Sequence, residues 1–503
     1  MLAQMLDAMH NRALGVDSVL VVRNGYIVLE SATYPYQAEA RHELFGVTQG
    51  VLSAVTGIAI EAGLIDGVRH PVLDYFAGRT VANLDERKRA LTLEHLLTMR
   101  AGMQWPAGPW PPRDAGSDWV QYILDRPMSD EPGATWLNNP GAAHLLSAIL
   151  QGVTGTTVAE YAQARLFGPL GIDRVYWEED PAGISEGPAG IWLAPRDVAK
   201  LGLLYLQGGA WDDRQIIPAG WVEASTTPRV DARDGVEFGY LWSTDPAGFH
   251  SVRGQQGQAL YVIPGTDMIA VFTGSMPDDA GLDALVREFL IPAAGQGPLP
   301  PNPSANTALA QRIRDAGARP AGNAVPPPPS MAAQVGTQVY RMDDNAYNWR
   351  SFSLTFDGPE ATWRVRTDDG MSEWRIGMDG VERVSPVVGG GPSLVAQKGA
   401  WQRDGKTFTI TERDVGHPGP GRSYSFTFEG DEVNIRVITW SGISVESMLG
   451  WGAVPTPGAG PTPVPADPFP WALGRRLSFD PMRGRSAQIV DGARRTVTWA
   501  QAR

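Results

Sequence analysis

The sequence predicts a mixed α/β (α+β) domain built on an antiparallel sheet, followed by a small all-β domain. A β-hairpin is expected at 18–30, because two β-rich runs flank Asn24-Gly25, a pair that accepts the positive φ of a type I′ turn. Strand-like runs return at 257–263 and 268–274. Strands at both ends of one region, with helical sequence between them, imply an antiparallel sheet flanked by helices with a helical insertion.

The helices of this first domain are expected in four places. One precedes the hairpin, at about 2–14, and one at 44–64 has helical spacing with many small residues, which suits a buried central helix. Residues 80–235 read as helices and loops with many Pro and Gly breaks. An amphipathic helix at 282–290 closes the domain.

Changes of composition divide the chain into four parts. The first domain covers 1–295, and a proline-rich linker follows at 296–333, with one short helix expected at 304–318. Residues 334–452 contain about eight alternating runs separated by turns, which predicts an antiparallel sandwich or barrel. Residues 453–503 begin as a Pro/Gly tether and end in a basic tail, which either is loosely attached or docks on an acidic surface.

Composition excludes several classes of protein. The chain has 503 residues, 43% hydrophobic content and 17 tryptophans, which is ample for large cores. A net charge of −13 argues against nucleic acid as a partner. No apolar run approaches the ~20 residues of a membrane span. The start lacks the basic region and apolar core of a signal peptide, so we expect a soluble, cytoplasmic protein, or an exported one if the true start lies upstream.

The most informative stretch is the predicted helix that begins near residue 43. The sequence at 43–60 is ELFGVTQGVLSAVTGIAI. It resembles the helix that carries Ser-x-x-Lys in the β-lactamase/penicillin-binding-protein superfamily of bacterial serine hydrolases. In that motif the serine attacks a carbonyl and the lysine accepts its proton. Gly46 occupies the serine position and Gln49 the lysine position. Glycine offers no nucleophile, and a neutral amide is no general base.

The resemblance extends over the first 295 residues, and it is strongest to class C β-lactamase-related esterases and nylon-oligomer hydrolases. It implies their fold, a sheet with helices and a helical insertion. Further segments follow the family's order at 91–105, 131–136, 190–206, 239–242, 254–258 and 262–267. The family's Tyr-x-Asn motif falls on 138–140, where Asn138 replaces the tyrosine and Pro140 the asparagine. Its third motif falls on Gln255, Gln256 and Gly257, just after His250.

No other part of the chain restores the missing groups. The chain has four lysines among its 42 basic residues, none of them before Lys88, so a shift of register brings no lysine onto the helix. We find neither a Ser-x-x-Lys nor a G-x-S-x-G motif anywhere in the sequence. Thr48 and Ser53 are hydroxyls on the same helix, but neither has an evident base. His42 and His144 are alternative bases, although a lone histidine is more often structural.

Three functions therefore stay open. The first is a pseudoenzyme, a hydrolase homologue without intact catalytic residues that binds a peptide-, ester- or amide-like small molecule. The second is an active esterase or amidase with a relocated nucleophile. The third is an interaction protein that acts through the β domain and the tail. Placing Ser, Lys and Tyr at positions 46, 49 and 138 is expected to bring back weak esterase activity.

The ligand site implied by the resemblance consists of Gly46, Gln49, Asn138, Pro140, Gln255, Gln256 and Gly257. Its uncharged amides both donate and accept hydrogen bonds, so they either bind a peptide-like or sugar-like ligand or simply satisfy one another. No metal-ligand spacing, phosphate loop or dinucleotide motif is present, so we expect no cofactor and no metal. The oligomeric state is left open.

Overall fold

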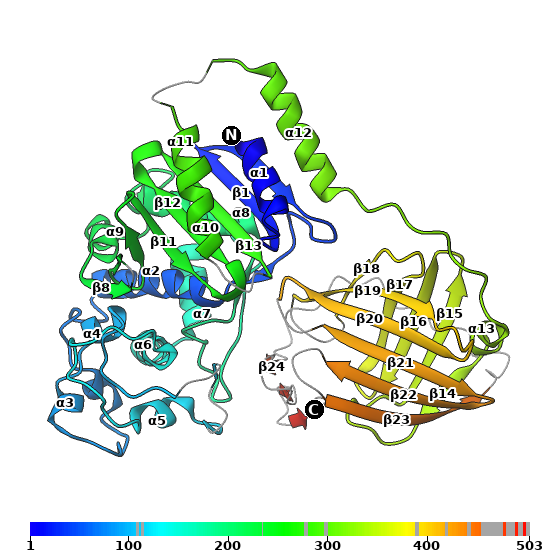
Figure 1. Ribbon diagram of the computed structural model, residues 1–503. Coiled ribbons are helices and arrows are strands. Elements are labelled where there is room, and N and C mark those ends of the chain that lie inside the picture. The colour runs from blue at the N-terminus through cyan, green and yellow to red at the C-terminus, as the bar shows by residue number, and fades with distance from the viewer. Residues whose placement is uncertain are drawn as a thin grey trace. The chain divides into compact units, whose positions relative to one another are not determined.

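The computed structural model forms two compact units, Met1–Ala318 and Arg319–Arg503 (Figure 1). It describes residues 1–106, 110–111, 115–233, 235–275, 280–295, 300–387, 392–417, 421–439 and 444–453, together with 476–478, 488–490 and 496–498. Among these residues, no helix has both the length and the apolarity needed to cross a bilayer.

The first unit contains an eight-stranded antiparallel sheet in the order β2-β1-β13-β12-β11-β10-β9-β8. The predicted hairpin is confirmed, because Asn24 and Gly25 join the first two strands with φ of 49° and 77°. The strands are β1 (Val16–Arg23), β2 (Tyr26–Ala32), β8 (Val230–Arg233), β9 (Val236–Phe238), β10 (Ser243–Asp245), β11 (Phe249–Arg253), β12 (Ala259–Ile263) and β13 (Met268–Gly274).

Helices cover both faces of this sheet (Figure 1). Alternation along β1 sends Val19 and Val21 to one core and Leu20 and Val22 to the other. The first face is covered by α1 (Leu2–Asn11), α10 (Ala280–Leu285), the π-helical turn η6 (Val286–Leu290) and α11 (Ile291–Ala293). The second face is covered by α8 (Pro195–Leu206), and the buried helix α2 (Thr48–Glu61) belongs to the same core.

A helical insertion packs on α2, as the sequence predicts. Its largest helix, α6 (Pro140–Thr154), contacts α2 directly, and α9 (Ala219–Thr226) packs on the same helix. The other helical segments are η1 (Phe45–Val47), η2 (Val72–Phe76), α3 (Glu86–Arg89), α4 (Leu93–Leu97), α5 (Trp119–Leu124), α7 (Val158–Ala162), η3 (Gln163–Phe167), η4 (Gln255–Gly257) and η5 (Pro264–Thr266). Two small sheets complete the unit, β3 (His42–Glu43) with β5 (Ile191–Leu193) and β4 (Tyr176–Trp177), and β6 (Ala210–Trp211) with β7 (Arg214–Gln215).

The short helix expected inside the linker is confirmed as α12 (Pro303–Gly317). It packs on the first unit, because Leu309 and Ile313 lie against the core beside α1 and Arg312 Nε bonds Asp7 Oδ1 at 2.7 Å. The first unit therefore extends beyond residue 295 and includes the first half of the predicted linker.

The second unit is a nine-stranded barrel rather than a sandwich. The order β17-β16-β15-β14-β23-β22-β21-β20-β19 closes where Gly377 of β17 pairs with Lys398 of β19, and β18 adds to β19. A short helix, α13 (Ser330–Val335), precedes it. The strands are β14 (Val339–Met342), β15 (Ser351–Asp357), β16 (Glu360–Thr367), β17 (Gly370–Gly377), β18 (Arg383–Pro386), β19 (Leu394–Trp401), β20 (Thr407–Val415), β21 (Arg422–Glu429), β22 (Glu432–Thr439) and β23 (Ser444–Ala453).

Three short strands follow the barrel in the predicted basic tail. They are β24 (Arg476–Ser478), β25 (Gln488–Val490) and β26 (Thr496–Thr498), and they pair as an antiparallel sheet. The rest of the tether and tail lies outside the described residues.

Candidate functional site

Gly46 lies in η1, immediately before the buried helix α2, which is where the motif places a nucleophile. The main chain of β11 closes over this position. A Cβ added to Gly46 would lie 2.3 Å from the carbonyl oxygen of Arg253, whereas real Cβ contacts essentially never fall below 3.0 Å. A Cβ on Gly254 would likewise lie 2.3 Å from the Leu44 carbonyl oxygen. The two glycines thus let two backbones meet at the position where the resemblance predicts a serine side chain.

The remaining polar groups of α2 serve the packing of the helix. Gln49 is half-buried in the first turn. Thr48 is fully buried, and its Oγ1 accepts the main-chain N–H of Ile191 at 3.3 Å. Ser53 is also fully buried and donates to the carbonyl oxygen of Tyr240 at 2.7 Å. Both hydroxyls that the helix offers as alternative nucleophiles are therefore engaged with main-chain groups.

The second motif forms the start of α6. Asn138 is exposed. Its neighbour Asn139 is 2% exposed and is the N-cap residue, whose Oδ1 accepts the N–H of Ala142 at 3.3 Å. Pro140 is the first helical residue, a position that needs no N–H. The sequence places Asn138 at the tyrosine position, which stays a prediction; its neighbour Asn139 caps the helix and also donates from Nδ2 to the Met103 carbonyl oxygen at 3.4 Å.

The third motif forms the turn η4 between β11 and β12. Gln255 is exposed, Gln256 is half-buried with φ of 60°, and Gly257 is buried with φ of 89°. His250 lies on β11, and its Nδ1 is 3.2 Å from Thr244 Oγ1 on the adjacent strand. Burial lowers the pKa of this histidine. The contact between His250 and Thr244 therefore joins two adjacent strands of the sheet.

Both lysines of the first unit have structural roles. Lys88 is 1% exposed, and its ammonium donates to the carbonyl oxygens of Ala82 and Leu124, each at 2.8 Å. Lys200 Nζ binds Asp197 and a main-chain carbonyl, each at 3.0 Å. Neither arrangement leaves a lysine as the general base of a serine.

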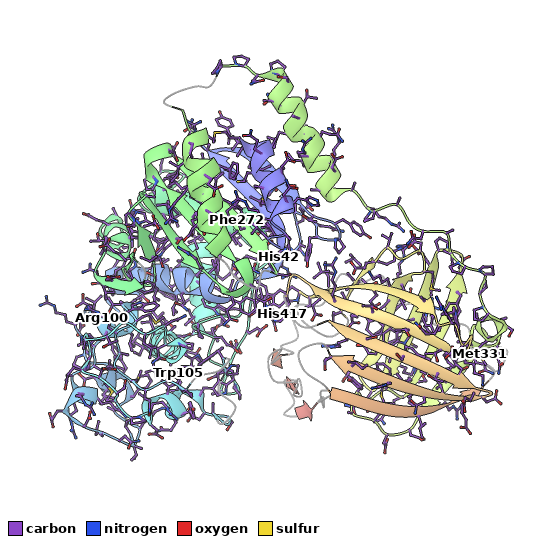
Figure 2. All side chains as sticks on the ribbon, in the orientation of Figure 1. His42, Arg100, Trp105, Phe272, Met331 and His417 are labelled. Atoms are coloured by element: carbon purple, nitrogen blue, oxygen red, sulfur yellow. The ribbon has the colours of Figure 1, made fainter. Side chains whose placement is uncertain are left out.

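The two alternative bases lie in the core. His144 and Asp180 have fully buried side chains, with Nε2 and Oδ2 3.2 Å apart, and the imidazole packs against Trp110 and Trp119. His42 is 1% exposed and its Nε2 is 3.5 Å from Thr273 Oγ1 (Figure 2). Among the described residues, Nδ1 of neither ring has a hydrogen-bond partner, so no carboxylate orients either imidazole through that atom. The Thr273 hydroxyl beside His42 Nε2 is itself 2.6 Å from Ser18 Oγ.

A group of carboxylates, two of them buried and one half-buried, lies directly beside the Gly46 segment. Glu43, Trp192 and Tyr176 are neighbours across β3, β5 and β4. Trp192 Nε1 donates to Glu178 Oε1 at 3.1 Å. Burial, and then the charges of Glu43 and Glu186, raise the pKa of Glu178 well above its ordinary value. We call Glu43, Glu178 and Glu186 the carboxylate cluster.

Sequence reasoning missed the carboxylate cluster. Glu178 and Glu186 are eight positions apart, and the N–H of Glu186 donates to the Glu178 carbonyl oxygen at 2.8 Å. Glu43 lies 135 positions before Glu178 and comes beside it through the pairing of β3, β5 and β4. Glu186 accepts from Trp110 Nε1 at 2.9 Å, a contact between residues 76 positions apart. The one sequence signal is that Glu43 directly precedes the motif helix. The raised pKa of Glu178 makes this cluster a candidate for acid–base chemistry beside the Gly46 segment.

The variant Glu178→Gln is expected to be more stable than the parent at pH 8, and the advantage should shrink as the pH falls. A raised pKa in the folded state means that the folded protein binds more protons than the unfolded chain, so stability is lost as pH rises through that pKa. A glutamine keeps the acceptor for Trp192 without the charge. Thermal unfolding between pH 5 and pH 8 measures the effect, with the exposed Glu223→Gln as control. A difference that is independent of pH would show that Glu178 ionises normally.

Comparison with known proteins assigns the first unit to a protein family. The Beta-lactamase family model matches residues 2–290. The 6-aminohexanoate-dimer hydrolase of Paenarthrobacter ureafaciens is 24% identical over 287 residues, which span 52% of this chain and 73% of that protein. Lovastatin esterase of Penicillium rubens is 32% identical over 136 residues, 25% of this chain and 33% of the relative.

A solved structure shows the same fold. A Bacillus anthracis protein, provisionally named a 6-aminohexanoate-dimer hydrolase, matches with a TM-score of 0.50 and 21% identity over 57% of this chain and 80% of that chain. The match of the family model, 289 residues from 2 to 290, exceeds half of the 503-residue chain. The protein therefore belongs to the Beta-lactamase family, the serine-hydrolase fold that its first unit displays.

Proposed function

We propose that the first unit is a non-catalytic member of its family, which binds a peptide-, ester- or amide-like small molecule without hydrolysing it. The observation that carries this proposal is the contact at Gly46, where the carbonyl oxygen of Arg253 occupies the space that a nucleophilic side chain needs. A serine hydrolase requires a hydroxyl at that point and a base beside it. Position 46 supplies no hydroxyl, and Gln49 is no base.

The ligand class follows from the groups that remain. Gln49, Gln255 and Gln256 carry amides, which donate and accept hydrogen bonds and so match a carbonyl-containing ligand without strong charge. The names of the two relatives, a dimer hydrolase and an esterase, favour a ligand with an amide or ester link. The same residues favour neither a metal nor an anionic cofactor.

A second candidate is hydrolysis by other groups. The carboxylate cluster favours it, because neighbouring carboxyl groups whose surroundings separate their pKa values can divide acid and base roles, and the pKa of Glu178 is raised. This candidate predicts turnover of an ester or amide that is lost in Glu178→Gln. The binding proposal predicts no turnover in either protein, so one assay separates the two.

The purified full-length chain is expected to remain unlabelled by fluorophosphonate and β-lactam acylating probes and to leave nitrophenyl esters intact. Intact-mass spectrometry after overnight incubation measures the first, and absorbance the second. An active serine esterase in the same tube serves as positive control. Stoichiometric labelling of any serine, Ser53 included, would overturn the proposal in favour of a relocated nucleophile.

The same preparation tests the binding half of the proposal. A panel of short peptides, esters and lactams is expected to contain a compound that raises the melting temperature, since a ligand that binds only the folded state stabilises it. The shift should be lost in Gln49→Leu and kept in Gln311→Leu, whose glutamine is exposed on α12. A shift that is equal in both variants would place the ligand elsewhere.

A further inference from the structure

The hairpin tip of the first unit carries the one Asn-Gly pair of the sequence, Asn24-Gly25. Both residues are exposed, and both have a positive φ, of 49° and 77°. A Cβ added to Gly25 would meet nothing within 4 Å. Water therefore reaches the junction between the two residues.

The side-chain amide of Asn24 and the main-chain nitrogen of Gly25 are both free of hydrogen bonds within the part of the chain that the structure describes. The main chain of Asn24 is held by one bond, from its N–H to the carbonyl oxygen of Asp267 at 2.9 Å. Neither the amide carbon nor the neighbouring nitrogen is thus protected by a partner. The two groups belong to adjacent residues, so they are always within one rotation of each other.

Few contacts hold this end of the hairpin. β2 is an edge strand of the sheet, and its first three residues, Tyr26, Ile27 and Val28, are 76%, 48% and 38% exposed. Strand ends with few buried apolar contacts open at a small cost in free energy. The turn is therefore able to leave its left-handed conformation, as it must before Cγ of Asn24 reaches the nitrogen of Gly25.

We propose that Asn24 is a site of spontaneous deamidation through attack by the main-chain nitrogen of Gly25. The proposal is independent of what the first unit binds. The nitrogen of Gly25 loses its proton to solvent base and forms a bond to Cγ of Asn24, and the side-chain nitrogen leaves as ammonia. Water then opens the resulting succinimide ring at either of its two carbonyls. The products are aspartate and isoaspartate, each with one new negative charge.

A second asparagine of the same unit provides the contrast. Asn83 is also exposed and has a φ of 50°, but the residue after it is Leu84, whose side chain crowds the main-chain nitrogen as glycine does not. The side chain of Asn83 is also held, because its Nδ2 donates to the carbonyl oxygen of Asp125 at 2.9 Å. Similar exposure and a similar φ therefore come with a much less reactive pair of groups.

The two products differ in their effect on the hairpin. Aspartate keeps the main chain as it is, and Asp-Gly supports the same type I′ turn as Asn-Gly. Isoaspartate routes the main chain through the side chain, which adds a methylene group to the connection. Arg23 pairs with Tyr26 directly across the turn, so a longer connection does not fit the two-residue loop. Isoaspartate at position 24 therefore loosens β2, whereas aspartate leaves it in place.

Ageing of the folded full-length chain in warm buffer at pH 8 tests the proposal. Peptide mapping by mass spectrometry measures the loss of each asparagine, and enzymatic methylation of isoaspartate separates the two products. When half of Asn24 has reacted, we expect Asn83 to be intact. The control is Asn24→Gly, in which Gly-Gly keeps the turn without a side-chain amide, and its hairpin peptide should gain no acidic form. An Asn24 that survives as long as Asn83 does would overturn the proposal.

The structural consequence is measured on separated products. Anion exchange isolates the isoaspartate form of the aged chain, and Asn24→Asp supplies a protein of the same charge with an unaltered main chain. We expect the isoaspartate form to melt several degrees below Asn24→Asp, by circular dichroism, because only the former lengthens the turn. Equal melting temperatures would show that the hairpin accepts the longer main chain, and the predicted loosening of β2 would then be wrong.

Discussion

Replacing Gly46 by serine is expected to lower the melting temperature of the first unit by several degrees and to leave the protein without hydrolytic activity. The new Cβ would fall 2.3 Å from the carbonyl oxygen of Arg253, which is main chain and cannot rotate away as a side chain does. Forcing extra atoms into a packed site of this kind costs about 1–3 kcal/mol. Thermal unfolding followed by circular dichroism measures the loss, and a nitrophenyl ester assay measures activity.

A matched glycine provides the control. Gly152 lies within α6, and a Cβ added there would meet nothing within 4 Å. Gly152→Ala is therefore expected to be neutral or to stabilise the helix by up to about 1 kcal/mol. If Gly46→Ser unfolds at the same temperature as the parent, the main chain at Arg253 has room to move and the central argument for lost catalysis fails.

The contact at Gly46 also changes what motif reasoning predicts for a restored enzyme. From sequence alone, Ser at 46, Lys at 49 and Tyr at 138 should return weak esterase activity. In the structure the serine has no space, and position 138 is exposed at the start of α6. We therefore expect the triple variant to be inactive. The backbone at Gly254 would first have to shift to make room for the serine, and only then could the three restored side chains act in catalysis.

Local patterns were sufficient to predict much of the fold. The hairpin followed from Asn24-Gly25, because the turn conformation is set by two adjacent residues. The buried helix α2 followed from its small, apolar residues, and α12 from a short helical run. Where α12 docks was not predictable from its proline-rich flanks, since the contacts of Leu309 and Ile313 depend on a surface formed by residues 300 positions earlier.

Non-local pairing decided the features that the sequence did not predict. Barrel closure depends on Gly377 meeting Lys398, and a run of alternating residues carries no information on whether its edges meet. The carboxylate cluster depends on β3, β4 and β5 lying side by side. The helix cap at Asn139, beside the predicted site residue Asn138, was likewise not evident from the motif. A motif predicts the spacing of residues along the chain. Which way each side chain points depends on the helix cap and on the packing around it.

Replacing His42 by glutamine is expected to make the first unit less sensitive to acid. Burial lowers the pKa of His42 to about 4, from an ordinary value of 6.5. The folded state therefore keeps the ring neutral while the unfolded chain takes up a proton, so stability is lost as the pH falls from 6.5 towards 4. A shift of this size corresponds to about 3 kcal/mol at the acid end, which is a large share of the stability of a domain. Glutamine has no such proton to bind.

The measurement is the difference in melting temperature between the variant and the parent from pH 7 to pH 4.5. At pH 7 we expect His42→Gln to be the less stable protein, because the imidazole stacks on Tyr36 and packs in the core, with ring centroids 5.9 Å apart. The difference should narrow, and then reverse, as the solution becomes acidic. His10→Gln, at an exposed histidine of α1, is the control and should follow the parent at every pH. Other buried groups titrate in both proteins alike and cancel in the difference. A difference that stays constant down to pH 4.5 would mean that the folded protein protonates His42 as readily as the unfolded chain does, and the ring would then have to reach solvent.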